Sequence, residues 1–198
     1  MVAVANTSNA TLADLLRREE IALPTISAHL EALTPDERVR QIDQLAGKAV
    51  QKRLWALCAD APPLTMDEII PPGKNEARWQ GRNSMAMFTT VDKRVVRQGG
   101  DIIGYNHVTG IGGWFGGPGY FTMLPAPGRA KEIVVDYTKL PTTAPAGWPA
   151  IVPNTKGTHT LVYGYLNDFC RRICDGVFIG AAERKGKFLD IYFTVART

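Results

Sequence analysis

The chain has 198 residues, of which 45% are hydrophobic and 21% charged, and its formal net charge at pH 7 is +4. This composition is typical of a soluble globular protein, and no apolar run reaches the roughly 18 residues that a membrane span needs. The basic residues are scattered along the chain, which argues against a nucleic-acid surface. The N-terminus has no signal-peptide pattern and the three cysteines are too few for a disulfide framework, so we expect a cytoplasmic protein.

Composition divides the chain into two parts. Residues 1–74 carry 8 Lys and Arg against 10 Asp and Glu, whereas residues 75–198 carry 15 against 9, together with every Phe and Tyr and 17 of the 19 Gly. Aromatic residues favour strands, and Pro-rich segments mark linkers. The sequence therefore predicts a helical extension over 1–60, a proline-rich linker over 61–75 and a β-rich domain over 76–198.

The first part carries clear helix signals. Thr11 and Asp14 fit a capping box, and a short helix is expected over 25–33. Thr34, followed by Pro35 and a carboxylate at the third helical position, predicts the start of a helix of roughly 35–58 with one apolar stripe. The stripe could pack on the domain behind it, or pair two copies of the chain as a homodimer. A DNA-reading role is disfavoured because the segment is net acidic.

The second part alternates short apolar runs with turn residues, which predicts an antiparallel barrel or strongly bent sheet of about eight strands. The fold class is therefore α+β. The segment 141–157 reads as a proline-rich connection anchored by Trp148, and 185–187 as a hairpin tip. Strands are expected near 77–81, 84–91, 94–98, 101–108, 119–124, 131–138, 159–166, 176–183 and 187–196.

Several of these strands carry one aliphatic face and one face that mixes aromatic and polar residues. In the last strand, Phe193 and Val195 lie on the first kind of face and Tyr192 on the second. A ligand-binding barrel would turn the mixed face inward, whereas a barrel with a filled core would turn it to solvent. The alternation leaves both possibilities open.

Five short segments in order resemble small calycin-type barrels. An early Trp-x-Gly strand, a late Tyr-rich strand and a closing hairpin that ends in a basic residue are similar to the bacterial GXWXG family and to the plastid-lipid-associated fibrillins. The resemblance covers residues 77–198 and implies a lipocalin-like barrel that holds a hydrophobic small molecule. Arg78 stands where the pattern has glycine, and the helices over 1–60 have no counterpart. The segments are ARWQGRNSM (77–85), DYTKLP (136–141), LVYGYLND (161–168), DGVFIG (175–180) and FLDIYFTVAR (188–197).

The stretch GIGGWFGGPG (110–119) is too rich in glycine for a regular element. It matches neither a dinucleotide fingerprint nor a P-loop. The stretch is better interpreted as a lid or a fixed plug that places Trp114 and Phe115 over a barrel end.

The candidate chemistry is acid–base. His107, Asp136 and His159 are the candidate catalytic or polar groups. Glu132 and Asp136 share a strand face but lie about 13 Å apart, too far for a carboxylate pair. The spacing predicts no metal site and identifies no cofactor, and Cys170 is expected to be an apolar residue of the core, as is the cysteine four residues later.

Three functions follow from this pattern. The first is binding or carriage of a hydrophobic small molecule in the barrel. The second is a lyase, isomerase or cyclase on the same barrel, and the third is an interaction module that dimerises through the 35–58 helix. The residues predicted to line or cover the ligand are Tyr105, Trp114, Phe115, Tyr120, Tyr137, Tyr163 and Tyr165.

Overall fold

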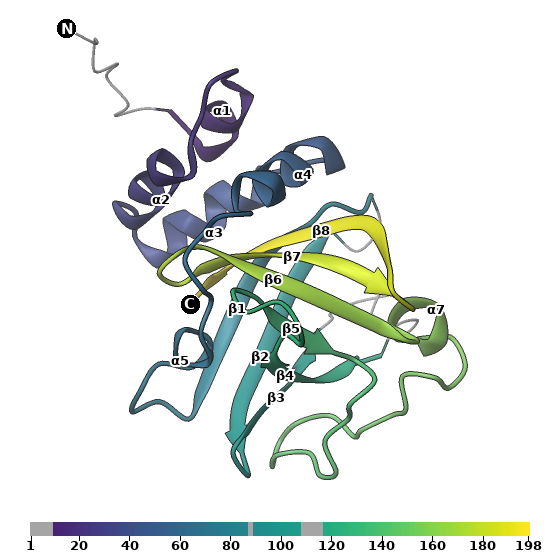
Figure 1. The fold of residues 1–198 in the computed structure, drawn as a ribbon. Helices are drawn as coiled ribbons and strands as arrows, with labels where there is room; N and C mark the ends of the chain where they lie inside the picture. Colours follow the sequence, from purple (N-terminus) through teal and green to yellow (C-terminus); the bar gives the residue numbers. More distant parts are fainter. Residues whose placement is uncertain (1–9, 87–88, 108–116) are drawn as a thin grey trace, which may run out of the picture.

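The structure is a computed structural model and describes residues 10–86, 89–107 and 117–198. Its described strands form one closed antiparallel barrel in which each strand pairs with its neighbours in sequence and the last returns to the first (Figure 1). The fold is thus an α+β barrel, as predicted. The strands are β1 (Glu76–Asn83), β2 (Thr90–Gln98), β3 (Asp101–Asn106), β4 (Tyr120–Pro125), β5 (Ile133–Asp136), β6 (Leu166–Cys174), β7 (Val177–Arg184) and β8 (Lys187–Arg197).

The barrel interior is a packed apolar core. Alternate residues of each strand point inward, so that Val91 and Val95 of β2, Ile102 of β3 and Phe121 of β4 share one buried cluster. Phe193 and Val195 of β8 belong to the same cluster. The aliphatic face of β8 therefore contributes to this core, and the face that holds Tyr192 does not.

Four helices cover the outside of β6, β7 and β8, in the upper left of Figure 1. They share a second buried core with these strands, in which Leu30 and Leu54 join Ile173, Ile179 and Ala196. In the described part of the chain no helix is long and apolar enough to cross a membrane. The four helices are α1 (Leu12–Arg17), α2 (Leu23–Glu31), α3 (Pro35–Asp43) and α4 (Lys48–Leu57).

The single helix predicted over 35–58 is wrong, because the structure divides it into α3 and α4. The apolar period continues across the break, and Ile42 and Leu54 lie in the same core. The backbone turns at Gly47, whose φ of 92° is readily adopted only by glycine. The capping box predicted at Thr34 is confirmed and begins α3.

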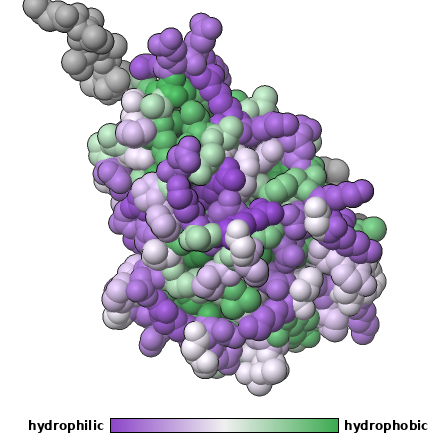
Figure 2. All heavy atoms as spheres, viewed as in Figure 1, coloured by the Kyte–Doolittle hydropathy of each residue, from purple (hydrophilic) through white to green (hydrophobic). Residues whose placement is uncertain are grey.

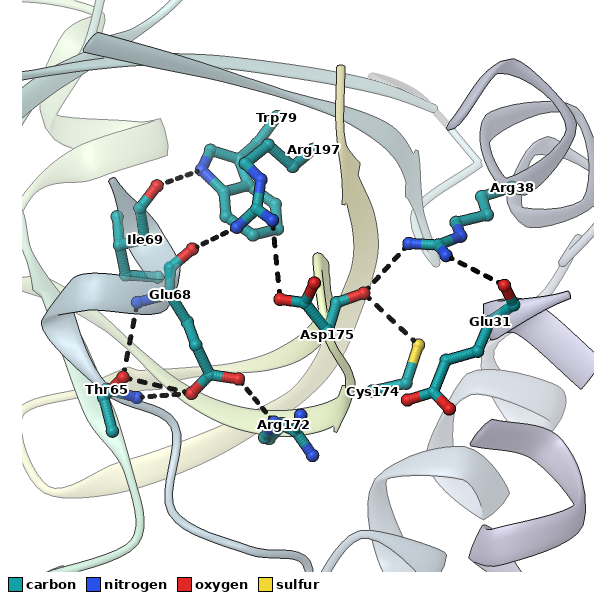
Figure 3. A network of polar contacts seen from close by, with 10 residues as sticks. All are labelled: Glu31, Arg38, Thr65, Glu68, Ile69, Trp79, Arg172, Cys174, Asp175 and Arg197. Carbon is teal, nitrogen blue, oxygen red and sulfur yellow. Dashed lines mark hydrogen bonds and ion pairs between the residues drawn. The ribbon is translucent and has the colours of Figure 1, made fainter. Parts of the chain in front are cut away.

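A short helix, α5 (Met66–Ile69), closes one end of the barrel, where the indole nitrogen of Trp79 donates to the carbonyl oxygen of Ile69 at 3.2 Å. Figure 3 shows the polar network around it. Arg197 donates to the carbonyl oxygen of Glu68 at 2.6 Å, and Arg172 pairs with the Glu68 carboxylate.

The same network reaches the N-terminal helices. Arg38 of α3 donates to the backbone oxygens of Leu30, Glu31 and Asp175, so that one guanidinium joins the end of α2 to the β6–β7 turn (Figure 3). We call the region around α5 the α5 end of the barrel.

The opposite end carries the longer strand connections and α7 (His159–Tyr163), and we call it the α7 end (Figure 1). The strand predicted over 159–166 is wrong, because this segment forms α7 before β6 begins. Thr, Val and Tyr suit a strand locally, but here Tyr163 packs against Tyr137 of the barrel core, and tertiary packing overrides the local preference. Trp148 anchors the preceding connection on Tyr105, as predicted, with ring centres 4.7 Å apart.

Two further strand predictions are wrong. The runs expected over 84–91 and 94–98 contribute to one continuous strand, β2, because Asp92 and Lys93 lie within the ladder and not in a turn. Strand β6 was missed, since its polar residues Asp168 and Arg171 interrupt the apolar alternation. The division into domains at 60 and 75 stays a prediction.

Gly180 offers a test of the core packing. A Cβ atom at this position would lie 2.3 Å from two carbons of the Phe193 ring. Gly180→Ala is expected to lower the free energy of unfolding by about 1–3 kcal/mol, measured by urea denaturation. The loss should shrink in a Phe193→Leu background, which lacks the ring, and an equal loss in both backgrounds would contradict this packing.

Candidate functional site in the barrel interior

Lys93 lies inside the barrel and is only 3% exposed. Strand alternation accounts for this position, since Lys93 is two residues from both Val91 and Val95, which face the core. A fully buried lysine is rare unless it is paired. The residues around it are therefore the first candidates for a functional site.

Three polar side chains surround the ammonium group of Lys93. Its Nζ donates to the phenol oxygen of Tyr137 at 2.6 Å and to the amide oxygen of Asn106 at 3.1 Å. The carboxylate of Asp168 lies 3.6 Å away and is also buried. Asn106 in turn donates to the Tyr137 oxygen at 3.0 Å. We call these four residues the Lys93 cluster.

Burial shifts the charged groups of the cluster toward their neutral forms. It lowers the pKa of Lys93, although the Asp168 carboxylate acts to raise it. It raises the pKa of Asp168, although Lys93 and Tyr137 act to lower it. The pKa of Tyr137 is also raised, chiefly by burial. Because one ammonium faces one carboxylate, the ionised pair carries no net charge, which limits the cost of keeping it in the core.

Three aromatic rings enclose the Lys93 ammonium. Its Nζ lies 5.0 Å from the ring centre of Phe121, 5.3 Å from that of Tyr137 and 4.7 Å from that of Phe193. The Phe121 ring packs against Gly104, where any side chain would bring Cβ within 2.5 Å of it. These contacts combine an apolar enclosure with a few polar groups, as small-molecule sites do.

Tyr163 of α7 covers the cluster at the α7 end. Its ring stacks on Tyr137 with centres 5.2 Å apart, and burial raises its pKa to about 12. Gly119 makes room for it, since a Cβ there would lie 2.3 Å from the Tyr163 ring. His159 packs in the same way against Gly117, the described end of the glycine-rich stretch. The rest of that stretch, with Trp114 and Phe115, lies outside the described residues.

Among the described residues that were predicted to contact a ligand, Tyr137 and Tyr163 are the two that the structure brings together in the barrel interior. Tyr105 and Tyr120 pack on each other and on Trp148, on the outer face of β3 and β4. Tyr165 is half exposed beyond the barrel. The part that each takes in ligand binding stays a prediction.

The candidate acid–base residues do not meet. His107 follows β3 and packs edge-on against Tyr105. Asp136 accepts hydrogen bonds from the backbone and hydroxyl of Thr138, in a turn at the end of β5. The Nδ1 atom of His159 is buried and has no hydrogen-bond partner among the described residues. A catalytic role for any of the three stays a prediction.

Sequence reasoning missed Lys93, Asn106 and Asp168. Lys93 lies between the two strands predicted over 84–91 and 94–98, although its even spacing from Val91 and Val95 is the signal that places it inside. Asp168 lies in the strand that was not predicted, and nothing local identifies its orientation.

The three cysteines are free and buried, as expected for core residues. Burial raises the pKa of both Cys58 and Cys174 to about 12, so their thiols stay protonated and unreactive at neutral pH. Across the described ranges, no three His, Cys, Asp or Glu side chains are grouped so as to hold a metal ion.

Lys93 and Asp168 offer a test of coupling. Lys93→Met or Asp168→Leu alone leaves an unpaired buried charge, and each is expected to cost about 3–5 kcal/mol of unfolding free energy. The double variant removes both charges and is expected to be close to wild type or more stable. Urea denaturation of the four proteins measures the coupling, and additive losses would show that the two groups do not interact.

The same pair predicts a pH dependence. Since the folded pKa of Asp168 is raised, its contribution to stability is full below the unfolded value of 3.8 and is lost as pH rises toward the folded pKa. Since the folded pKa of Lys93 is lowered, its contribution is full above 10.5 and is lost as pH falls toward the folded pKa. Relative to the Lys93→Met/Asp168→Leu variant, wild type should therefore gain stability at both extremes. Parallel curves of unfolding free energy against pH would contradict this.

In comparisons with known proteins, no family model, curated protein or solved structure matches the chain. The closed antiparallel barrel is consistent with the calycin-like architecture that the sequence motifs implied. A relationship to the GXWXG family or to the fibrillins stays a prediction.

Proposed function

We propose that the barrel binds a mainly hydrophobic small molecule at its α7 end, with the Lys93 cluster as the polar anchor. The observation that carries this proposal is that Lys93, Asp168 and Tyr137 are buried together inside an otherwise apolar barrel, with the partly buried Asn106 beside them. A buried ion pair is weak support for stability, because apolar residues of similar volume often serve as well. The cluster could bind a polar group of a ligand selectively, which apolar residues in its place could not do.

The charge balance of the cluster limits the ligand class. Lys93 and Asp168 already neutralise each other, so a carboxylate or phosphate on the ligand would add an uncompensated charge to the core. A neutral hydroxyl or carbonyl group adds none. Asn106 is the cluster member that is only partly buried, and its side-chain amide could form a hydrogen bond with a ligand oxygen beside Lys93. The expected ligand is therefore a mainly apolar molecule with one neutral polar group.

Access to the cluster would depend on α7. Tyr163 lies over Tyr137, and its helix spans only five residues, from His159 to Tyr163. Displacing one short helix exposes the polar cluster without breaking a strand pair of the barrel. Trp114 and Phe115 remain candidates for additional cover.

A second candidate is acid–base catalysis on the bound molecule, as in a lyase, isomerase or cyclase. The observation that favours it is the 2.6 Å hydrogen bond from Lys93 to Tyr137, next to a carboxyl group whose pKa is raised. Groups with shifted pKa values in contact with one another are common at catalytic sites. Recovery of the ligand separates the two candidates, since carriage returns it unchanged and catalysis converts it in a Lys93-dependent way.

A third candidate is a homodimer through the N-terminal helices. The apolar stripe of 35–58, through which the sequence predicts dimerisation, packs on β6–β8, so the proposal rests on α1 and α2 instead. It is supported by an apolar groove on α1 and α2, in the upper part of Figure 2, which is bordered by polar residues. Leu15, Ala28 and Leu33 are among its lining residues.

The first test is native mass spectrometry of the purified protein, followed by calorimetric titration with matched ligands. A long-chain alcohol and a long-chain ketone are expected to bind more tightly than the carboxylic acid of the same length. Asn106→Ala should weaken alcohol binding about tenfold, since one hydrogen bond contributes roughly 1.5 kcal/mol. Asn75→Ala, at the α5 end, is the matched control and should bind as wild type does. Equal affinity for all three ligands, or equal losses in both variants, would overturn the proposed anchor.

A further inference from the structure

The turn between β7 and β8 lies in an exposed surface that the candidate site does not use. Among the described residues four large hydrophobic side chains are exposed, and three of them lie in or beside this hairpin: Leu161 at 77%, Tyr165 at 50% and Phe188 at 49% exposure. Apolar side chains gathered at one place on a surface mark interaction sites more often than scattered ones do. We call the hairpin patch the set Leu161, Tyr165, Arg184, Lys185, Lys187 and Phe188.

Specific contacts hold the two sides of the patch together. Arg184 donates to the backbone oxygens of Leu161 and Val162, at 3.2 and 3.1 Å. Lys185 places its Nζ atom 4.6 Å from the ring centre of Tyr165. Leu161 of α7, Tyr165 and the basic residues of the β7–β8 turn therefore lie side by side. The exposed ring of Phe188, in β8, lies next to Trp55 and Phe169.

The positive charge of the patch is not compensated. Arg184, Lys185 and Lys187 form no ion pair within the described part of the chain, although fourteen such pairs are formed elsewhere in it. The nearest acidic residues in sequence have other partners: Glu183 pairs with Arg129, and Asp190 pairs with two lysines of α4. The hairpin therefore presents two exposed lysines, Lys185 and Lys187, beside exposed apolar side chains, and the partly buried Arg184 adds a third positive charge.

The backbone conformation at two residues of the patch indicates that their side chains were not selected for the stability of the fold. Lys185 has a φ of 52° and Tyr165 a φ of 56°, and they are two of the three non-glycine residues with positive φ among those described. Asparagine and glycine adopt this conformation at lower cost. Lys185 and Gly186 are the central residues of the hairpin turn, where Asn-Gly is the preferred pair. A lysine and a tyrosine thus occupy positions that other residues would stabilise better.

We propose that the hairpin patch docks the protein on an anionic lipid membrane. The lysines would contact lipid phosphates, while Leu161, Tyr165 and Phe188 enter the apolar side of the interface. A bilayer suits this surface better than an acidic protein does, because the apolar side chains flank a projecting turn, and a fluid interface can surround such a turn from every side. This inference does not rest on the proposed ligand, although docking here would bring the α7 end of the barrel next to lipid.

Sedimentation with vesicles tests the proposal. Wild type is expected to bind vesicles of phosphatidylcholine and phosphatidylglycerol in equal parts, to bind pure phosphatidylcholine weakly, and to be released by high salt. Lys185→Asn and Lys187→Gln should each weaken binding about fivefold. Tyr165→Asn should weaken it as well. Lys74→Gln, which removes an exposed lysine at the α5 end, is the matched control and should bind as wild type does.

The thermal midpoint of unfolding shows whether a variant has lost vesicle binding because it is less stable. Lys185→Asn and Tyr165→Asn both place asparagine in a left-handed conformation, so each is expected to raise the midpoint while it weakens binding. Unchanged vesicle binding in these variants, or an equal loss in Lys74→Gln, would overturn the proposal. Retention of wild type on polyglutamate without binding to the anionic vesicles would also overturn it, in favour of an acidic protein partner.

Discussion

The antiparallel pairing of β1 with β8 is the constraint on which the other features depend. It closes the sheet, so that each described strand has two neighbours and no edge is left open to a second chain. The seam is tight at Gly81, where a Cβ would lie 2.1 Å from the Thr194 carbonyl oxygen and 2.9 Å from the side chain of Ile42. The first strand, the last strand and α3 thus meet at one point. Closure also creates the interior in which Lys93 is removed from water.

The two ends of the barrel are built differently. At the α5 end, arginines bind backbone oxygens and carboxylates and fix the helices to the strand turns. These contacts leave little freedom for movement. At the α7 end, a five-residue helix and aromatic rings resting on glycines cover the Lys93 cluster. This difference between the two ends agrees with the proposal that a ligand would enter at the α7 end.

Much of the fold could be predicted from the sequence, since capping residues, prolines and alternating apolar residues act locally. The boundary of α3 at Thr34 and the hairpin at 185–187 are examples. The errors arose where distant contacts decide the conformation. Tyr163 forms a helical turn because its ring packs on Tyr137, and β6 is a strand because both of its neighbours pair with it. The site was harder to predict than the fold, because Asp168, the carboxylate next to Lys93, lies in the strand β6 that the sequence did not predict.

The packing of α1–α4 on β6–β8 also bears on how the chain folds during synthesis. The ribosome releases the helices well before Ile173, Ile179 and Ala196, which form the other half of their core. Until then the apolar stripe of α3 and α4 has no native partner, and short helices alone are marginal in water. Contacts so distant in sequence make folding slow, because the closure of long loops precedes any gain from packing. The helices therefore acquire the stability that their apolar stripe provides only after β6, β7 and β8 have been synthesised.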